Sequence, residues 1–206
     1  MEGNIQIVEK PDWVTWADIK QCLYEAHADN RSKGINMAHY KWPVERIKDS
    51  LGKNGVVLVA LDGKRLVGTA AMGDKVGKSW YTRGPYAYIC FDAVLPEYSG
   101  KGIFKMLDIK REQLAMDMGY KTLVFDTHSK NTHRQEIATN NGYRLVRYFL
   151  ASSKDHYSVV MAKWLDGCQY SKVYCWWKFQ ISRVKTLFVC SKVIFRQRGF
   201  ENGANL

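Results

Sequence analysis

The stretch that decides the fold is residues 86–103, which read YAYICFDAVLPEYSGKGI. Its first ten residues are rich in β-branched and aromatic side chains, a composition typical of a buried strand. Residues 96–102 then interrupt the apolar run with a proline, a serine and two glycines. An amphipathic pattern follows as far as Met118. The sequence therefore predicts a strand, a glycine-containing turn and a helix, in that order.

A turn of this kind is suited to binding phosphate. The first N–H groups of a helix have no partner within it, and the helix dipole favours negative charge at that end. Gly100 and Gly102 have no Cβ, so a phosphate can approach their backbone closely. Lys105 stands where a dinucleotide-binding fingerprint needs its third glycine, and the P-loop spacing is also missing. A plain strand-to-helix turn that uses glycine is the alternative.

On both sides of this stretch, short apolar runs alternate with amphipathic segments. We expect the strands to cover residues 4–9, 55–61, 65–72, 86–95, 121–127, 143–149 and 157–163. Asp62-Gly63 is the predicted hairpin turn, Asp12 the predicted cap of the first helix, and 73–85 a predicted loop. We expect the helices at 13–28, 43–51, 103–118 and 131–140. The predicted fold class is α/β (α+β), a mixed central sheet of six to seven strands flanked by helices.

Two motifs make the chain resemble the GNAT N-acetyltransferase family. The run from Val94 to Ile103 is similar to the family's acyl-coenzyme A binding segment, Arg/Gln-x-x-Gly-x-Gly/Ala. Asn131, followed by Asn141-Gly142-Tyr143, is similar to its Asn-helix-Gly-Phe/Tyr segment. The resemblance covers residues 1–163 and implies the GNAT fold. It also implies an N-acyltransferase that moves an acetyl or other acyl group from acyl-CoA directly to an amine.

The resemblance also implies which residues bind acetyl-CoA, the co-substrate. The expected oxyanion donor is a backbone N–H near Val94, where the family's fourth strand bulges. The full set of expected binding residues is Val94, Tyr98, Ser99, Gly100, Lys101, Gly102, Ile103 and Asn131. Asn131 can equally be a plain helix N-cap.

The sequence departs from the family at two positions. Glu97 replaces the first Arg/Gln of the motif, which puts a carboxylate near the expected phosphate site. Ala138 stands where many members have a tyrosine that acts as general acid for the departing thiolate. His133 and Tyr98 are the candidate substitutes, and a solvated polar side chain is the alternative reading of each.

Two residues are candidates for the base that deprotonates the amine. By the period-two alternation of a strand, Asp92 shares a face with Tyr88, Cys90 and Val94, and burial would raise its pKa. A structural carboxylate is the alternative. His128 follows the next strand and titrates near neutrality, so it can act directly or through water; a loop histidine is the alternative.

The acceptor is less defined by the sequence. Residues 31–42 carry basic and aromatic side chains where the family forms one wall of the acceptor site. We expect a small-molecule amine or sugar-amine acceptor. Two other classes stay open: an acyl-CoA-binding protein with weak or no catalysis, and a peripheral membrane module acting through its C-terminal tail.

Composition narrows the remaining classes. The 206 residues are 46% hydrophobic and 25% charged, as in folded domains. No apolar segment reaches the ~20 residues that a transmembrane helix needs. The five cysteines and five histidines are dispersed, so we expect neither disulfides nor a bound metal. We expect a cytoplasmic protein, or one peripheral to the membrane, with a homodimer as a possible assembly.

The last part of the chain, residues 164–206, is predicted to be a basic amphipathic helical extension. Its net charge is +5, from seven Lys/Arg against Asp166 and Glu201. One helical arc is apolar and is bordered by Lys178, Lys185 and Lys192 on one side and Lys172 and Arg183 on the other. The arc contains Val173, Trp176, Trp177, Ile181, Val184, Leu187, Phe188, Ile194 and Phe195. An anionic membrane surface could bind residues 168–198 through this arc, or the arc could pack on its own domain or a second subunit. The arc is too wide for a nucleic-acid arm.

Overall fold

The computed structural model describes residues 4–35, 37–77, 79–82, 84–151, 155–167 and 170–201, with the backbone alone at 38, 76, 77, 84 and 189–201. Its strands are β1 (Ile5–Glu9), β2 (Val56–Asp62), β3 (Arg65–Gly77), β4 (Gly84–Val94), β5 (Thr122–His128), β6 (Arg144–Leu150) and β7 (Tyr157–Trp164). They form one sheet in the order β1-β2-β3-β4-β5-β7-β6. The β4–β5 pair is parallel, whereas β1 to β4 and the β6–β7 pair are antiparallel. The sheet is therefore mixed, as predicted.

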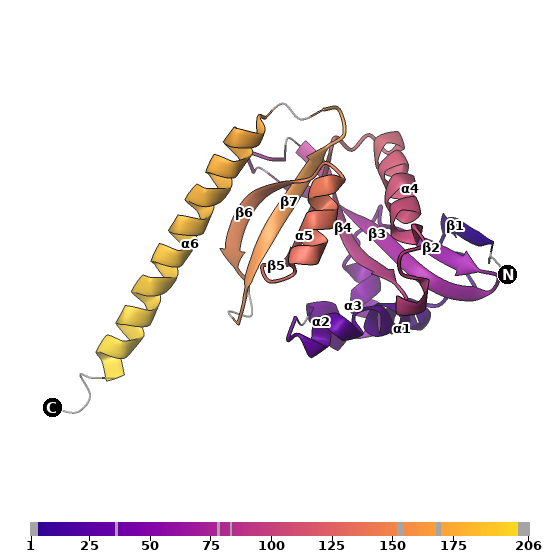
Figure 1. The fold of residues 1–206 in the computed structure, drawn as a ribbon, viewed down its shortest axis with the longest axis horizontal. Helices are drawn as coiled ribbons and strands as arrows, with labels where there is room; N and C mark the ends of the chain where they lie inside the picture. Colours follow the sequence, from indigo (N-terminus) through magenta and orange to yellow (C-terminus); the bar gives the residue numbers. More distant parts are fainter. Residues whose placement is uncertain are drawn as a thin grey trace. The chain divides into compact units, whose positions relative to one another are not determined.

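The helices confirm the predicted α/β fold. They are α1 (Trp16–Ala26), α2 (Ala28–Ser32), α3 (Val44–Asp49), α4 (Ile103–Asp117), α5 (Thr132–Asn140) and α6 (Lys172–Glu201), with short 3-10 turns η1 (Ala38–Lys41) and η2 (Pro96–Tyr98) (Figure 1). The chain forms two compact units, Met1–Phe125 with Lys163–Gly167, and Asp126–Ala162 with Cys168–Leu206.

Three local predictions were wrong. The cap of α1 is Thr15, whose hydroxyl accepts from the Asp18 N–H at 3.1 Å while the Asp18 carboxylate accepts from the Thr15 N–H at 2.7 Å. Residues 73–77 continue β3, because they stay in register with Gly84–Tyr88 of β4. The hairpin loop is Gly63-Lys64, one residue later than predicted, since Asp62 still pairs with Arg65.

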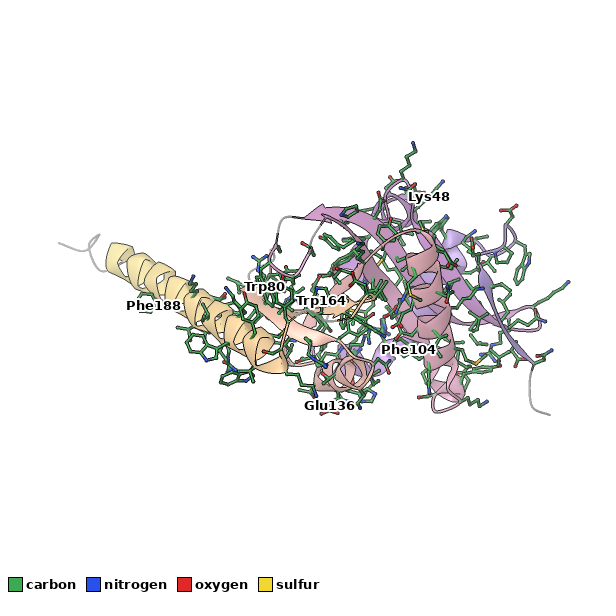
Figure 2. The ribbon with its side chains drawn as sticks, turned by 90° about the horizontal axis from the view of Figure 1, so that it is seen from above. Lys48, Trp80, Phe104, Glu136, Trp164 and Phe188 are labelled. Atoms are coloured by element: carbon green, nitrogen blue, oxygen red, sulfur yellow. The ribbon has the colours of Figure 1, made fainter. Side chains whose placement is uncertain are left out.

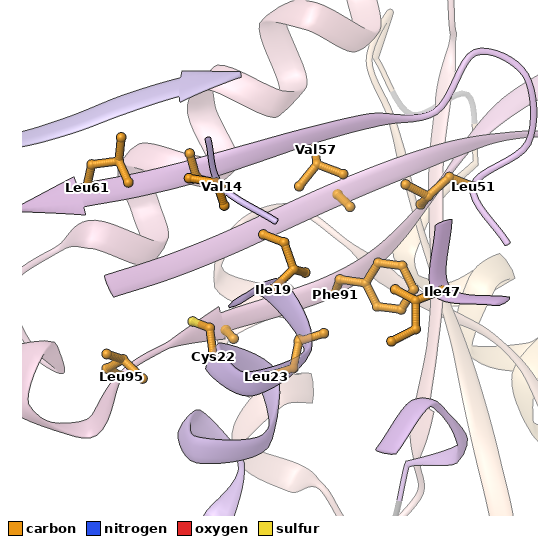
Figure 3. Packing of buried hydrophobic residues seen from close by; sticks show 13 residues of the cluster. Val14, Ile19, Cys22, Leu23, Ile47, Leu51, Val57, Leu61, Phe91 and Leu95 are labelled. Carbon is orange, nitrogen blue, oxygen red and sulfur yellow. The ribbon is translucent and has the colours of Figure 1, made fainter. Parts of the chain in front are cut away.

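Both faces of the sheet are covered in the first unit. Along β2, Val57, Val59 and Leu61 point to one core cluster, and Leu58 and Ala60 point to another. The first cluster joins these strands to buried side chains of α1 and α3, as Figure 3 shows for Ile19, Cys22, Leu23 and Ile47. The second cluster contains Ile103 and Leu107 of α4. Residues 55–61 therefore read as a continuous apolar run because neither face of β2 meets water.

In the second unit, α6 runs beside β6, the last strand in the sheet order (Figure 1). Four residues of α6 face β6. Cys175 and Phe179 are buried there, and the hydroxyls of Ser182 and Thr186 hydrogen-bond to the backbone of Tyr148. The helical extension thus packs on its own unit, but with the face opposite to the apolar arc. The side chains predicted at 192–195 lie outside the described residues.

Candidate active site

The glycine turn between β4 and α4 has the geometry of an anion site. Gly100 has φ +77° and Gly102 has φ +75°, a left-handed conformation that favours glycine. A Cβ built on either glycine would meet no atom within 4 Å, so the space above both is open. No side chain caps the 15-residue helix α4, whose N-cap is Gly102. The first N–H groups of α4 therefore point into open space beside two glycines.

Two side chains of the turn are held away from that space. The Glu97 carboxylate pairs with the Arg65 guanidinium of β3. The Tyr98 hydroxyl donates to Asp62 at 2.9 Å, and this bond raises the pKa of Tyr98. The Nζ atom of Lys101 lies over the Tyr98 ring, 4.7 Å from the ring centroid. The negative charge that the sequence places at position 97 is thus paired with a cation of β3, and Tyr98 is poorly placed to give up its proton.

A β-bulge interrupts β4 just before the turn. Thr69 pairs with Ala93 while Ala71 pairs with Cys90, so Phe91 and Asp92 together oppose one residue of β3. Phe91 has φ +56°, the one positive φ among the described non-glycine residues. Val94, by contrast, is in regular pairing with Gly68. The bulge expected near Val94 therefore lies two to three residues earlier, and Phe91 and Asp92 carry the displaced backbone amides.

The bulge breaks the predicted alternation at Cys90, which packs on the cluster beneath α1, while Asp92 still shares the α4 side of the strand with Val94. Phe91 and Ala93 enter the cluster beneath α1, whereas the Asp92 carboxylate pairs with Arg111 of α4. Arg111 also donates to Asp108 at 2.6 Å and to the Ala71 carbonyl at 3.4 Å. Asp92 thus joins the bulge to α4 through a buried ion pair. This arrangement supports the structural alternative for Asp92 more than a free general base.

A pair of histidines lies on the other side of the bulge. The His27 Nε2–H donates to the Asp92 carbonyl at 2.9 Å, which leaves Nδ1 as the unprotonated nitrogen. The ring centroid of His39 lies 6.0 Å from that of His27 and 5.7 Å from that of Phe91. Burial lowers the pKa of His39 to about 4 and also lowers that of His27. Both imidazoles are therefore neutral at pH 7.

These histidines also carry open hydrogen-bonding capacity. Within the part of the chain that the structure describes, His27 Nδ1 and His39 Nε2 are buried and lack a hydrogen-bond partner. A buried polar atom without a partner costs about 1–3 kcal/mol, so such atoms usually await water or a ligand. Arg31 and two tyrosines adjoin the pair, with Arg31 3.7 Å from the Tyr24 ring centroid and 5.3 Å from that of Tyr40. These side chains form a polar, aromatic cluster beside the bulge.

The remaining predicted residues lie in the second unit. Asn131 is buried and caps α5, accepting from the Arg134 N–H at 3.3 Å, while its amide donates to the Thr127 hydroxyl at 3.3 Å. His128 accepts from the Lys130 N–H at 3.0 Å and stacks on His156 with 4.6 Å between centroids. Burial and the neighbouring His156 lower the pKa of His128.

The position that lacks the family tyrosine also lies in the second unit. Ala138 is fully buried in α5, so it exposes no group that could serve as an acid.

The strand β4 is paired with β5 over a short stretch only. β4 and β5 pair at Ala87–Leu123 and Tyr88–Val124, whereas β4 continues to Val94. Among the described strands, the ladder to β5 covers only these two residues of β4. Residues 89–94 therefore have no strand partner on that edge within the described part of the chain, although the Asp92 carbonyl accepts from His27.

The amino-acid sequence matches the profile of a known protein family. The profile of the "Acetyltransferase (GNAT) family" matches residues 15–143, more than half of the chain. The chain therefore belongs to the GNAT acetyltransferase family, as its two motifs predicted, and the family uses acetyl-CoA. None of the curated protein sequences matches the chain.

Solved structures show the same fold at low sequence identity. A coenzyme A complex of the PaiA N-acetyltransferase from Thermoplasma acidophilum has a TM-score of 0.59 and 17% identity, covering 78% of this chain and 99% of that one. The ribosomal-protein-S18-alanine N-acetyltransferase of Escherichia coli has a TM-score of 0.57 and 14% identity, with coverage of 81% and 97%. An aminoglycoside 6'-acetyltransferase type Ii has a TM-score of 0.59 and 16% identity, with coverage of 78% and 97%.

Sequence reasoning missed His27, Arg65 and Arg111. His27 sits at the end of a predicted helix, and nothing in its neighbourhood signals a bond to a carbonyl 65 residues away. Arg111 had one available signal, because a positive charge on the face that packs against an apolar strand calls for a carboxylate partner. No group of three or more potential metal ligands occurs within the described residues.

Proposed function

We propose that the protein is an N-acyltransferase that transfers an acetyl group, or another acyl group, from acyl-CoA directly to an amine. The observation that carries the proposal is the pair of left-handed glycines at the uncapped start of α4. Backbone N–H groups of Gly100, Lys101, Gly102 and Ile103 would bind the pyrophosphate, with the helix dipole adding to the attraction. Arg65 removes the charge of Glu97 from the same region.

The rest of the co-substrate would follow the chain outward from that turn. The amide-bearing arm of coenzyme A would bind along the edge of β4 that β5 leaves without a strand partner. In the second unit, Asn131 is the residue proposed to bond to an amide of coenzyme A. The thioester that acyl-CoA supplies is activated when its oxygen is bound by N–H donors. The bulge at Phe91–Asp92 places displaced backbone amides next to that edge, where they would stabilise the developing oxyanion.

The proton of the attacking amine goes to a neutral histidine in this proposal. An alkylammonium has a pKa near ~10.4, so the amine must lose a proton before it attacks. His128 and His39 are both uncharged at pH 7, and His39 also has an unpartnered nitrogen. Asp92 would act as a positioning residue that holds the bulge through Arg111. The leaving thiolate, with a cysteine-like pKa near ~8.5, can depart without an acid at position 138.

We propose a small-molecule amine or a sugar amine as the acceptor. The cluster formed by His39, Tyr40 and Arg31 combines hydrogen-bonding nitrogens, aromatic rings and one positive charge. Rings stack on sugar faces and other flat groups, while the guanidinium binds an anionic or hydroxyl substituent. The similarity in fold to an aminoglycoside acetyltransferase is compatible with such an acceptor.

Two measurements test the proposal. Isothermal titration with acetyl-CoA and with desulfo-CoA should give micromolar binding of both, and thiol release with a panel of amines should then report turnover. The variants His39→Phe and His128→Ala should show which histidine accepts the proton, through a tenfold or greater loss of turnover with coenzyme A binding intact. Asp92→Asn should lower both turnover and stability. Binding without turnover on any amine would favour the binding-only alternative, and no binding of either ligand would refute the proposal.

A further inference from the structure

Helix α6 binds its own unit through one narrow face. Cys175 and Phe179 are buried on this face, and the Phe179 ring packs edge-on against Tyr148 of β6. Ser182 accepts a hydrogen bond from the Tyr148 N–H, and Thr186 donates one to the Tyr148 carbonyl, each at 2.9 Å. These four positions lie within one arc of about 60° when each residue turns the helix by ~100°. These contacts with β6 therefore involve none of the residues of the apolar arc.

The opposite face of α6 is exposed and apolar. Trp176 is 58% exposed, Trp177 60% and Phe188 61%, and Phe188 projects from the helix in Figure 2. We call this surface the apolar stripe; its members are Val173, Trp176, Trp177, Val184, Leu187 and Phe188. Single exposed apolar residues are normal, but a contiguous line of them on one helix marks an interaction surface.

Positive charge borders the apolar stripe along both sides. Lys178 and Lys185 follow one border, and Lys172 and Arg183 the other. No acidic residue occurs between positions 170 and 188. A surface hollow of about 410 Å³ combines both features, since Trp177 and Ile181 line it together with Lys178. The partner of this surface must therefore be apolar in the middle and negative around it.

We propose that the apolar stripe binds the surface of an anionic phospholipid bilayer. The indole rings and Phe188 would enter the boundary between headgroups and acyl chains, where tryptophan is favoured. The lysines would extend their ammonium groups to the lipid phosphates on either side. The helix would lie in the plane of the membrane, because no helix within the described residues is long and apolar enough to cross one.

A bilayer fits the charge pattern better than two other occupants. A second copy of α6 would bring two sets of flanking cations together with no acid among residues 170–188 to pair with them. A nucleic acid would satisfy the cations but would leave the six apolar side chains without a matching surface. Anionic lipid supplies both the negative headgroups and the apolar interior.

Flotation of the full-length protein with lipid vesicles tests this proposal. Vesicles of phosphatidylcholine with 30% phosphatidylglycerol should carry the protein, and pure phosphatidylcholine should carry much less. Trp176→Ser/Trp177→Ser should weaken binding to the anionic vesicles at least tenfold. Lys178→Gln/Lys185→Gln should weaken it about thirty-fold, because each basic side chain near an anionic surface contributes about fivefold.

Matched variants in the first unit serve as controls. Trp13→Ser removes a tryptophan that is 54% exposed, and Lys48→Gln/Lys64→Gln removes two exposed lysines. Neither should alter flotation, and thermal melting should show that all variants fold. The proposal is overturned if the wild type does not float with anionic vesicles, or if the controls lose as much binding as the stripe variants. A stable dimer that the Trp176/Trp177 variant dissociates would assign the stripe to a second copy instead.

Discussion

The guanidinium of Arg111 donates two hydrogen bonds to the carboxylate of Asp92, and the Arg111 side chain is only 1% exposed. Arg111 belongs to α4, the helix that begins at the glycine turn, and Asp92 belongs to the bulge in β4. The two backbone features proposed to bind the pyrophosphate and the oxyanion are thus connected by one ion pair. Asp108 adds a second carboxylate to the same guanidinium.

Arg111→Met should reduce the free energy of unfolding by about 3–5 kcal/mol, because the carboxylates of Asp92 and Asp108, 13% and 6% exposed, would lose the guanidinium that pairs with both. Urea denaturation followed by circular dichroism measures the change. Lys163→Met is the control, since it breaks the more exposed pair with Glu112 and should cost about 1 kcal/mol or less. Equal losses for the two variants would show that the Arg111 pair has no special structural weight.

Stability should fall as the pH is lowered from 6.5 to 4, and His39 is one cause. In the unfolded chain His39 binds a proton below its ordinary pKa of 6.5, whereas burial lowers the pKa in the folded state to about 4. The unfolded state therefore binds more protons in this window, and the loss reaches about 3 kcal/mol at its lower end. Denaturation midpoints measured across this range should change less steeply in His39→Phe. An unchanged slope would mean that His39 protonates freely in the folded protein.

The sequence was sufficient to predict the turn between β4 and α4, because two glycines between an apolar run and an amphipathic segment indicate a strand-to-helix turn. It was not sufficient for the bulge. Residues 88–94 form an apolar run with Asp92 as its one charged member, so period-two alternation puts Cys90 on the same face as Asp92 and Val94. In the structure Cys90 packs on the α1 side, whereas Asp92 and Val94 face α4. A bulge adds one residue without changing the composition of the strand. The positive φ of Phe91 marks the bulge in the structure but leaves no signal in the sequence.

Asp92, one of the two predicted bases, is paired with Arg111. His27 and His39 next to the bulge were not predicted as bases, although His39 lies within the predicted acceptor wall at 31–42.

The C-terminal helix shows a second limit of sequence reasoning. The helical wheel separates the apolar arc from the face with Ser182 and Thr186 correctly, but hydrophobicity alone assigns the apolar arc to the core. In the structure the face with Ser182 and Thr186 packs on β6 instead. β6 is an edge strand, so the backbone groups on its outer side need partners other than a strand. Hydroxyl side chains can bond both the N–H and the C=O of such an edge, whereas tryptophan can only donate and valine can do neither.

Ser182→Ala/Thr186→Ala should destabilise the second unit by about 1–3 kcal/mol, since the Tyr148 N–H and carbonyl would lose their partners. Hydrogen exchange of the Tyr148 amide reports the loss directly and should accelerate. Ser171→Ala, at the start of α6, is the control, because its hydroxyl bonds only to the Tyr174 N–H of the same helix. An unchanged exchange rate at Tyr148 in the double variant would show that α6 does not protect the strand edge.

Arg65→Ala should weaken coenzyme A binding about fivefold, because the released Glu97 carboxylate would repel the pyrophosphate with the roughly 1 kcal/mol of one surface charge. Arg65→Ala/Glu97→Gln should restore the affinity of the wild type, as measured by titration calorimetry. If the double variant binds as weakly as Arg65→Ala, then Arg65 acts on the phosphates itself and not by pairing with Glu97.

The sharpest test of the proposed phosphate site compares two glycines at opposite ends of α4. Gly102 precedes the helix with φ +75°, and Gly119 follows it with φ +79°. A Cβ on either would meet no atom within 4 Å, so alanine should cost each the same ~1 kcal/mol of backbone strain. Their effects on stability should therefore be indistinguishable in a thermal melt.

Their effects on ligand binding should differ. In Gly102→Ala the new methyl group would occupy the open space above the first N–H groups of α4, and the strained turn would shift those groups. Coenzyme A affinity should fall at least tenfold, while Gly119→Ala should bind as the wild type does. The same titration with a coenzyme A fragment that lacks the pyrophosphate should show no difference between the variants. Equal affinity of both variants for intact coenzyme A would place the pyrophosphate elsewhere and remove the observation on which the proposed activity rests.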